Sequence, residues 1–230
     1  MVKFGFVVEG PTDRAVLENI LIGYFDEDIS EYFTRLVPRE MKDSGGWSRV
    51  ITYCQSTDFV DAFDDNDFII VQIDTDISFE FKVLHDEDGE KLPIDVLVKN
   101  VKTYFADLFK TAFGETFLAQ FGNRILLAIA VHSTECWLLP LYFKADKDKM
   151  EIKNCYKKLN TKVPKLDEKY KRYDEISAEY RNGKTLRKSV YKNVSLNLFF
   201  EELLLKVPIN VENSTNTEGY KNVVGNFISH

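Results

Sequence analysis

MVKFGFVVEGPTDRAV, residues 1–16, is the stretch that decides the fold. An apolar run ends at Glu9 and is followed by Gly10 and Pro11. Beyond the proline, apolar side chains recur at helical spacing: Val16, Leu17, Ile20, Leu21 and Tyr24. This pattern predicts a buried strand, a tight turn and a helix. It also places the carboxylate of Glu9 at the carboxyl end of a strand, where open α/β sheets keep their binding sites.

The next 130 residues alternate between strand and helix patterns. Strands are predicted at 34–38, at 68–71 and at 124–131, and the β-branched run at 68–71 indicates a central parallel strand. Helical patterns occupy 47–63 with a break near Ser56, 94–113 with Gly114 as a cap, and 136–143, while Asp88-Gly89 suits a hairpin turn. The fold class we predict is α/β, a Rossmann-like, mostly parallel sheet sandwiched by helices.

The composition changes near Lys144. Residues 144–192 are polar and helix-prone, with an apolar stripe along a helix that Asn182-Gly183 ends: Leu166, Tyr170, Tyr173, Ile176 and Tyr180. Residues 194–207 predict another helix, and we expect a loosely ordered tail from Pro208. We therefore predict an α/β domain over 1–143 and a helical, partly basic appendage with a tail over 144–230.

The net charge of −7 conceals two oppositely charged regions. Residues 1–143 contain 12 Lys and Arg against 25 Asp and Glu, a balance of −13, whereas residues 144–192 contain 16 against 8, a balance of +8. This division suits a protein that holds cations in one place and a polyanion in another. The cluster Lys184, Arg187, Lys188 and Lys192, at spacings of three and four, is our candidate for phosphate contact; an ordinary solvated helix face explains it equally well.

Neither a membrane helix nor a basic segment leading into an apolar signal is present in the 230 residues, so we expect a cytoplasmic protein with no membrane partner. The three cysteines, Cys54, Cys136 and Cys155, show no close paired spacing. We expect them to be reduced thiols in the core.

Three carboxylates close the two best-defined strands. Glu9 ends the first strand, and Asp74 and Asp76 end the strand that begins at Phe68, with Thr75 pointing away from both. Neighbouring parallel strands would bring these acids together, where they repel one another unless a cation lies between them. Mg²⁺ or Mn²⁺ is the usual cation at such an all-oxygen site, and it can bind a phosphodiester oxygen and activate water.

These motifs resemble those of the Toprim superfamily: a strand ending in Glu9-Gly10, with Asp13 three residues on, and a later strand ending Asp74-Thr75-Asp76. Toprim domains occur in topoisomerases, primases, a recombination-repair protein and OLD-type nucleases. The resemblance covers residues 1–140 and implies a divalent metal and phosphodiester transfer or cleavage on DNA or RNA. It implies a general acid/base role for Glu9 and metal ligation by Asp74 and Asp76.

The chain as a whole is similar to small stand-alone Toprim-like proteins linked to phage defence or mobile elements. In those proteins a segment resembling residues 132–139 (HSTECWLL) follows the last core strand, and it would present His132 and the metal ligand Glu135 at the same edge. The chain lacks a recognisable topoisomerase cleavage tyrosine and a primase zinc motif, which argues against those two activities. OLD-type nucleases join their Toprim part to an ATPase, whereas no G-x-x-x-x-G-K-[ST] motif is present here, which suggests a separate ATPase or other defence-system subunit.

Simpler explanations exist for several of these residues. Asp13, at the third position of its helix, suits the helix dipole, and this is the interpretation we favour for it. Glu9 has a ready partner in Arg14 without any metal. Asp74 and Asp76 can cap a turn, Glu135 can cap the helix that begins near Ser133, and His132 alone is more often a hydrogen-bonded histidine than a base.

Two hypotheses follow. The first is a metal-dependent nuclease or phosphodiester transferase in which Glu9, Asp74 and Asp76 hold one or two cations, with Glu135 as a further ligand. The second is a non-catalytic Toprim-like subunit that binds nucleic acid or assembles a larger complex. Phosphoryl transfer on a small nucleotide is a third option, and the sequence leaves open whether the chain is a monomer or a homo-oligomer.

Overall fold

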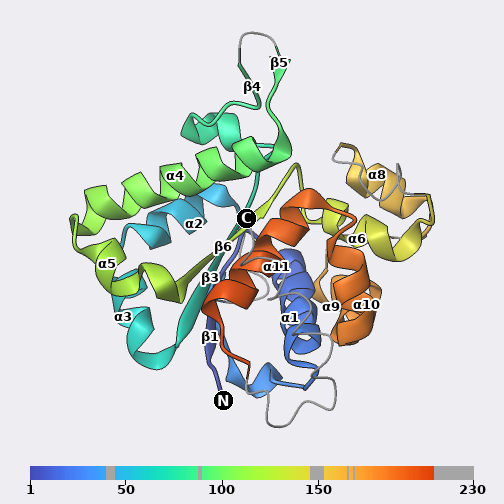
Figure 1. The fold of residues 1–230 in the computed structure, drawn as a ribbon, viewed down its shortest axis with the longest axis horizontal. Coiled ribbons are helices and arrows are strands. Elements are labelled where there is room, and N and C mark those ends of the chain that lie inside the picture. The colour runs from blue at the N-terminus through green and yellow to red at the C-terminus, as the bar shows by residue number, and fades with distance from the viewer. Residues whose placement is uncertain (40–44, 88–89, 146–152, 165, 168, 210–230) are drawn as a thin grey trace, which may run out of the picture.

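A four-stranded parallel sheet in the order β2-β1-β3-β6 forms the centre of the computed structural model (Figure 1). The structure describes residues 1–39, 45–87, 90–145, 153–164, 166–167 and 169–209. The strands are β1 (Phe4–Val7), β2 (Phe33–Val37), β3 (Phe68–Asp74) and β6 (Ile125–Ala130). β1 pairs with both β2 and β3, with Phe6 opposite Ile70. The α/β class and the parallel sheet predicted from the sequence are confirmed, at the level of a Rossmann-like fold.

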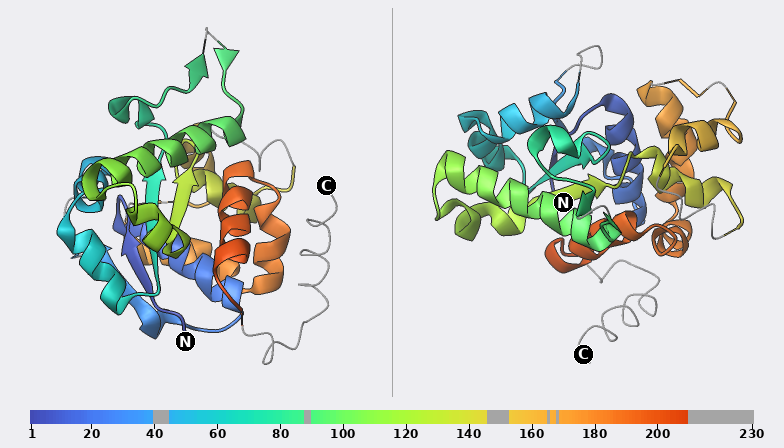
Figure 2. Two further views of the ribbon diagram at one scale, coloured as in Figure 1. Left: turned by 60° about the vertical axis from the view of Figure 1, so that its left-hand side comes forward. Right: turned by 90° about the horizontal axis from the view of Figure 1, so that it is seen from above.

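Helices cover both faces of this sheet (Figure 2). One face carries α2 (Trp47–Cys54), α3 (Thr57–Asp65), α4 (Ile94–Phe113) and α5 (Phe117–Phe121). The other carries α1 (Pro11–Phe25), α6 (Glu135–Tyr142), α8 (Cys155–Asn160), α9 (Tyr170–Ser177), α10 (Gly183–Val190) and α11 (Val194–Lys206). Short 3-10 helices are η1 (Ser30–Tyr32), η2 (Ser78–Phe81), η3 (Gly122–Arg124) and η4 (Ala178–Arg181).

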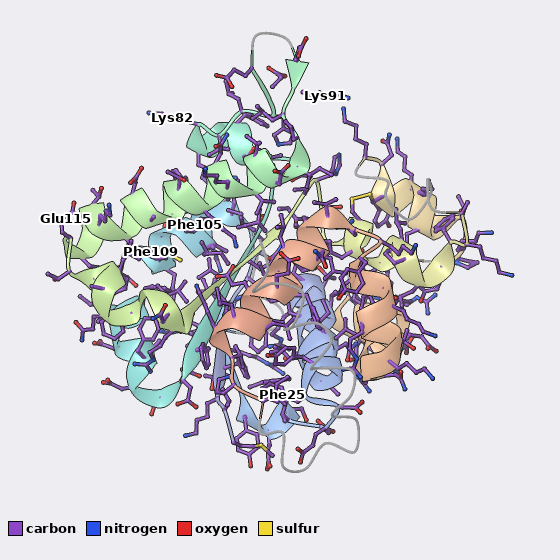
Figure 3. All side chains as sticks on the ribbon, in the orientation of Figure 1. Phe25, Lys82, Lys91, Phe105, Phe109 and Glu115 are labelled. Atoms are coloured by element: carbon purple, nitrogen blue, oxygen red, sulfur yellow. A yellow bond between two sulfur atoms is a disulfide. The ribbon has the colours of Figure 1, made fainter. Side chains whose placement is uncertain are left out.

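The alternation of side chains along the strands feeds two hydrophobic cores. Phe4 and Phe6 of β1 face α1, while Val7 faces the helices of the opposite layer. On that second face, Phe105 and Phe109 of α4 are buried, whereas Glu115 beyond the helix lies at the surface (Figure 3). Both faces of the central strands are therefore sealed from water, which is why their sequences are almost continuously apolar.

Several local predictions are confirmed. The pattern at 47–63 is two helices with a break at Gln55-Ser56, and the helix at 94–113 has the predicted bounds with Gly114 as its C-cap. Asp88-Gly89 and residues 210–230 lie outside the described residues. The strands on either side of Asp88-Gly89, β4 (Asp86–Glu87) and β5 (Glu90–Lys91), pair antiparallel. Among the described helices none has the length and apolar character needed to cross a membrane.

The expectation for the cysteines is wrong in part. Cys136 and Cys155 form a disulfide that joins α6 to α8, with their Cα atoms 5.0 Å apart. The pairing was hidden because the two residues are 19 positions apart in sequence and meet only through the packing of α8 on α6. Cys54 is the buried free thiol that we expected.

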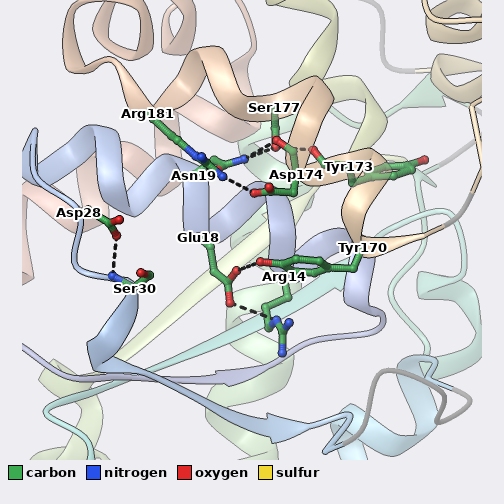
Figure 4. A network of polar contacts seen from close by, with 10 residues as sticks. All are labelled: Arg14, Glu18, Asn19, Asp28, Ser30, Tyr170, Tyr173, Asp174, Ser177 and Arg181. Atoms are coloured by element: carbon green, nitrogen blue, oxygen red, sulfur yellow. Dashed lines mark hydrogen bonds and ion pairs between the residues drawn. The ribbon is translucent and has the colours of Figure 1, made fainter.

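The helices after residue 144 pack directly on α1. Asn19 of α1 donates to Ser177 Oγ at 2.6 Å and accepts from Arg181 Nε at 2.6 Å (Figure 4). Tyr173 and Tyr180 are fully buried in the core that α1 shares with the sheet. The stripe predicted for this region is therefore core, although α9 starts only at Tyr170 and Leu166 lies before it. The predicted end of that helix at Asn182-Gly183 is wrong, because α9 ends at Ser177 and Asn182 instead caps the start of α10 through Thr185 N.

α1 approaches these helices closely at Gly23. A Cβ atom there would lie 1.8 Å from the carbonyl oxygen of Tyr180. We expect Gly23→Ala to lower the free energy of unfolding by about 2 kcal/mol, because backbone cannot yield as a side chain can. Urea unfolding followed by circular dichroism measures this change.

Gly122→Ala is the matched control. A Cβ atom at Gly122 finds its nearest neighbour 3.8 Å away, so stability should change by less than about 0.5 kcal/mol. Equal stabilities for the two variants would contradict the packing of η4 on α1.

Candidate active site at the carboxyl edge of the sheet

The carboxyl ends of β1 and β3 lie side by side where the chain connections diverge. The helix that follows β1 (α1) covers one face of the sheet, and the one that follows β3 (α4) covers the other. Such a divergence opens a crevice at the carboxyl edge of a parallel sheet, which is the usual position of ligand sites in this architecture. Glu9 and Asp74 occupy this position.

Glu9 is fixed through every polar group it has. Its carboxylate accepts a hydrogen bond from Asp74 N at 2.6 Å and another from the backbone N–H of Trp47. Its own N–H donates to Gln72 Oε1 at 3.1 Å, and its carbonyl accepts from Gly46 N at 2.7 Å. The first residue of α2 and the last of β3 thus meet at one glutamate.

Gly45 allows this close approach. A Cβ atom at Gly45 would lie 1.7 Å from the Glu9 carbonyl oxygen, so only glycine fits between the turn and the strand end. The start of α2 is thereby brought against the β1–α1 turn.

Asp74 and Asp13 compete for the hydroxyl proton of Thr134. Thr134 Oγ1 lies 3.2 Å from Asp74 Oδ1, and its side chain also hydrogen-bonds to Asp13. A threonine hydroxyl has one proton, so it can satisfy only one of the two carboxylates at a time. Gln72 Nε2 donates to Asp74 Oδ1 at 2.8 Å and relieves part of this deficit. When both acids are ionised, a negative oxygen remains without a donor from Thr134.

Burial makes this arrangement electrostatically costly. Desolvation raises the pKa of Glu9 to about 8 and that of Asp13 to about 7, with neighbouring carboxylates adding to both effects. Burial also raises the pKa of Asp74 well above its usual range, and repulsion from Asp13 and Glu9 contributes further. No lysine or arginine is among the main electrostatic partners of these three acids in the described part of the chain.

Asp76 and Glu135 lie at the rim of this group. Desolvation raises the pKa of Asp76, repulsion from Glu135 adds to it, and His132 and His85 oppose it. Asp76 is exposed because β3 ends at Asp74 and the chain turns away, so the strand alternation expected for Asp74 and Asp76 stops there. Glu135 is the first residue of α6 and accepts a hydrogen bond at 2.5 Å from the hydroxyl of Tyr173.

His132, which follows β6, links the end of that strand to the end of β3. It adopts a left-handed backbone with φ of 68°, its N–H donates to Thr75 Oγ1 at 2.8 Å and its carbonyl accepts from Asp76 N at 3.1 Å. A non-glycine residue in this conformation is held there by its surroundings. These two hydrogen bonds of His132 keep the β6–α6 turn, and with it Glu135, beside the turn that follows β3.

The sequence-predicted acids are therefore brought together, and two interpretations change. Asp13 is 8% exposed and takes part in the group, so a role limited to the helix dipole is wrong. Arg14 does not serve as the partner proposed for Glu9, since its ion pair is with Glu18 at 3.1 Å and its guanidinium lies over the ring of Tyr170 (Figure 4). The sequence did not predict that Tyr173 and Thr134 belong to this site, because only the tertiary packing brings their hydroxyls to the acids.

The predicted basic cluster is only partly on one helix. Lys184, Arg187 and Lys188 belong to α10, whereas Lys192 follows the end of that helix. α10 begins beside Gly23, near the end of α1 that points away from the acids. Gly23 is twelve residues after Pro11 in α1, a rise of about 18 Å. The role of this cluster in nucleic-acid binding stays a prediction.

The chemistry of the acids suits a hard divalent cation, but their present arrangement is not a ligand shell. Carboxylate oxygens are the donors that Mg²⁺ and Mn²⁺ prefer. Within the described residues, however, no three His, Cys, Asp or Glu side chains converge as metal ligands. Cation binding at this edge therefore requires side-chain rotation by at least some of the acids.

Comparison with known proteins adds no relatives. No family model matches the chain, and neither the curated proteins nor the solved structures give a match. The Toprim resemblance thus stays a prediction that depends on the two sequence motifs and on their order along the chain.

The raised pKa of Glu9 predicts how stability depends on pH in a chelating buffer. Between the ordinary value of 4.5 and the folded value of about 8, the folded state keeps a proton that the unfolded state releases. This contribution is fully present below the lower value and is lost as the pH rises through the higher one. We expect Glu9 to contribute a fall in the free energy of unfolding of up to about 1.4 kcal/mol per pH unit across this window. The raised pKa values of Asp13 and Asp74 add to this fall.

Urea unfolding in EDTA at a series of pH values measures this slope. Glu9→Gln keeps the acceptor for Asp74 N and removes the titration, so its slope should be shallower. Asp107→Asn, on the exposed face of α4, should keep the wild-type slope. Identical slopes for wild type and Glu9→Gln would show that Glu9 is not held protonated.

Proposed function

We propose that the chain is a divalent-metal-dependent nuclease or related phosphodiester transferase acting on DNA or RNA, with its cation held by Glu9, Asp74, Asp76 and Glu135. The observation that carries this proposal is the gathering of acids at the strand divergence, where Asp13 is buried and Glu9 and Asp74 are partly buried. No lysine or arginine of the described residues is among the main electrostatic partners of these three acids. An arrangement this costly to the apo fold is explained if a cation offsets it on binding.

Mg²⁺ or Mn²⁺ at this position would polarise a phosphodiester oxygen and lower the pKa of water. The residues of the chain would do the rest. Glu9, whose carboxylate accepts a hydrogen bond from Asp74 N at 2.6 Å, is placed beside the other acids to accept and return a proton. Asp13 would be a further acid of the site, and its hydrogen bond with Thr134 would orient that hydroxyl toward the acids. Tyr173 would orient Glu135 through its hydrogen bond at 2.5 Å.

One observation favours the second candidate, a non-catalytic subunit of a larger complex. The described side chains do not converge as metal ligands, as they would in a preformed metal centre. Protons held on the raised-pKa acids would then stabilise the edge without any cation. In that case an ATPase or another defence-system subunit would be the natural partner, and phage defence the setting that the resemblance implies.

Cleavage of labelled oligonucleotides in Mn²⁺ distinguishes the two candidates. We expect the wild type to cut DNA or RNA, and Glu9→Gln and Asp74→Asn to lower the rate by about 10²–10⁴-fold, because each removes a charge or a proton-transfer group from the site. Asp107→Asn should retain the wild-type rate. Circular dichroism checks that all variants are folded.

Undiminished cleavage by Glu9→Gln and Asp74→Asn would disprove the proposed site. If the wild type binds oligonucleotides without cleaving them, with or without Mn²⁺, the non-catalytic candidate is supported instead.

A further inference from the structure

A shallow groove of about 460 Å³ lies between the edge strand β2 and helix α2. Leu36, Pro38 and Tyr53 contribute its apolar lining, which we call the floor. The exposed side chains of Arg39, Arg49 and Asp58 also line it. The volume lies within the range of small-ligand sites, roughly 300–1,000 Å³. None of the acids gathered at the carboxyl edge of the sheet lines this groove.

Both walls of the groove originate at the acidic edge. Val8 N donates to Val37 O at 2.9 Å, so Pro38 and Arg39 leave β2 beside the segment that carries Glu9. The other wall is the start of α2, where Trp47 donates its N–H to the Glu9 carboxylate and Arg49 follows two residues later. A ligand in the groove would therefore extend toward the carboxylates.

The groove combines an apolar floor with arginines in a strongly acidic part of the chain. Arg39 and Arg49 are both exposed. Arg39 pairs with Asp58 at 3.0 Å, but the two side chains are 71% and 56% exposed, so the pair is weak and open to exchange for another anion. Planar guanidinium groups favour phosphate, and an aromatic floor favours a nucleobase.

We propose that this groove binds one nucleotide of a single-stranded nucleic acid, with the base on the Pro38 and Tyr53 floor and the flanking phosphates on Arg39 and Arg49. The strand must be single because a base paired in a duplex cannot lie flat on a protein surface. The delivery of the next phosphodiester to the acids rests on the proposed function, whereas binding in the groove does not.

Fluorescence anisotropy with fluorescein-labelled dT12 in EDTA tests binding alone. We expect Arg39→Ala/Arg49→Ala to weaken binding at least about tenfold and to reduce the salt slope by about 1.4, or about 0.7 for each phosphate that an arginine no longer neutralises. The matched control is Lys99→Ala/Lys110→Ala, which removes two exposed charges from α4, one of them in the exposed pair of Lys110 with Glu115. It should change binding less than about twofold.

Equal losses in the two double variants would show that only diffuse charge is sensed, and unchanged binding by Arg39→Ala/Arg49→Ala would remove the groove as a site. The Mn²⁺ cleavage assay separates this proposal from the nuclease proposal. Cleavage with an unchanged KM in Arg39→Ala/Arg49→Ala overturns the groove alone. Groove-dependent binding without cleavage by the wild type overturns the nuclease alone.

Discussion

The hydrogen bond from the backbone N–H of Asp74 to the carboxylate of Glu9, 2.6 Å long, is the contact on which the acidic edge depends. It joins the ends of two neighbouring parallel strands and fixes an acid beside the starts of α1 and α2. Repulsion among buried carboxylates opposes this arrangement, and it grows as the local dielectric falls. The surrounding hydrogen bonds keep the acids together despite that repulsion.

The C-terminal helices supply part of this support. Ser195, in the first turn of α11, accepts a hydrogen bond from Trp137 Nε1 at 2.8 Å and another from Val131 N at 3.3 Å. These contacts secure the turn between β6 and α6, which carries Thr134 and Glu135. With the hydroxyl of Tyr173 on Glu135, the region after residue 144 stabilises the acidic edge as well as covering the sheet. These hydrogen bonds connect the C-terminal helices to the acidic edge independently of their basic charge.

Much of the fold could be predicted from the sequence, because strands buried on both faces leave continuous apolar runs, as at 68–71, and long helices leave a clear period and a cap, as at 94–113. The meeting of Glu9 and Asp74 followed from the general rule for parallel sheets. What could not be predicted depends on tertiary packing. The burial of Asp13, the aim of the Tyr173 hydroxyl and the pairing of Cys136 with Cys155 each need the position of a distant helix. The groove needs β2 to lie at the edge of the sheet.

A crystal structure grown with Mn²⁺, with anomalous scattering recorded at the manganese edge, tests the central claim most directly. The account predicts an anomalous peak at the carboxyl edge with oxygens of Glu9 and Asp74 about 2.0–2.3 Å away, after a rotation of the acids from their present positions. A saturating Mn²⁺ concentration that leaves the edge without a peak, with Glu9 still on Asp74 N, would contradict it.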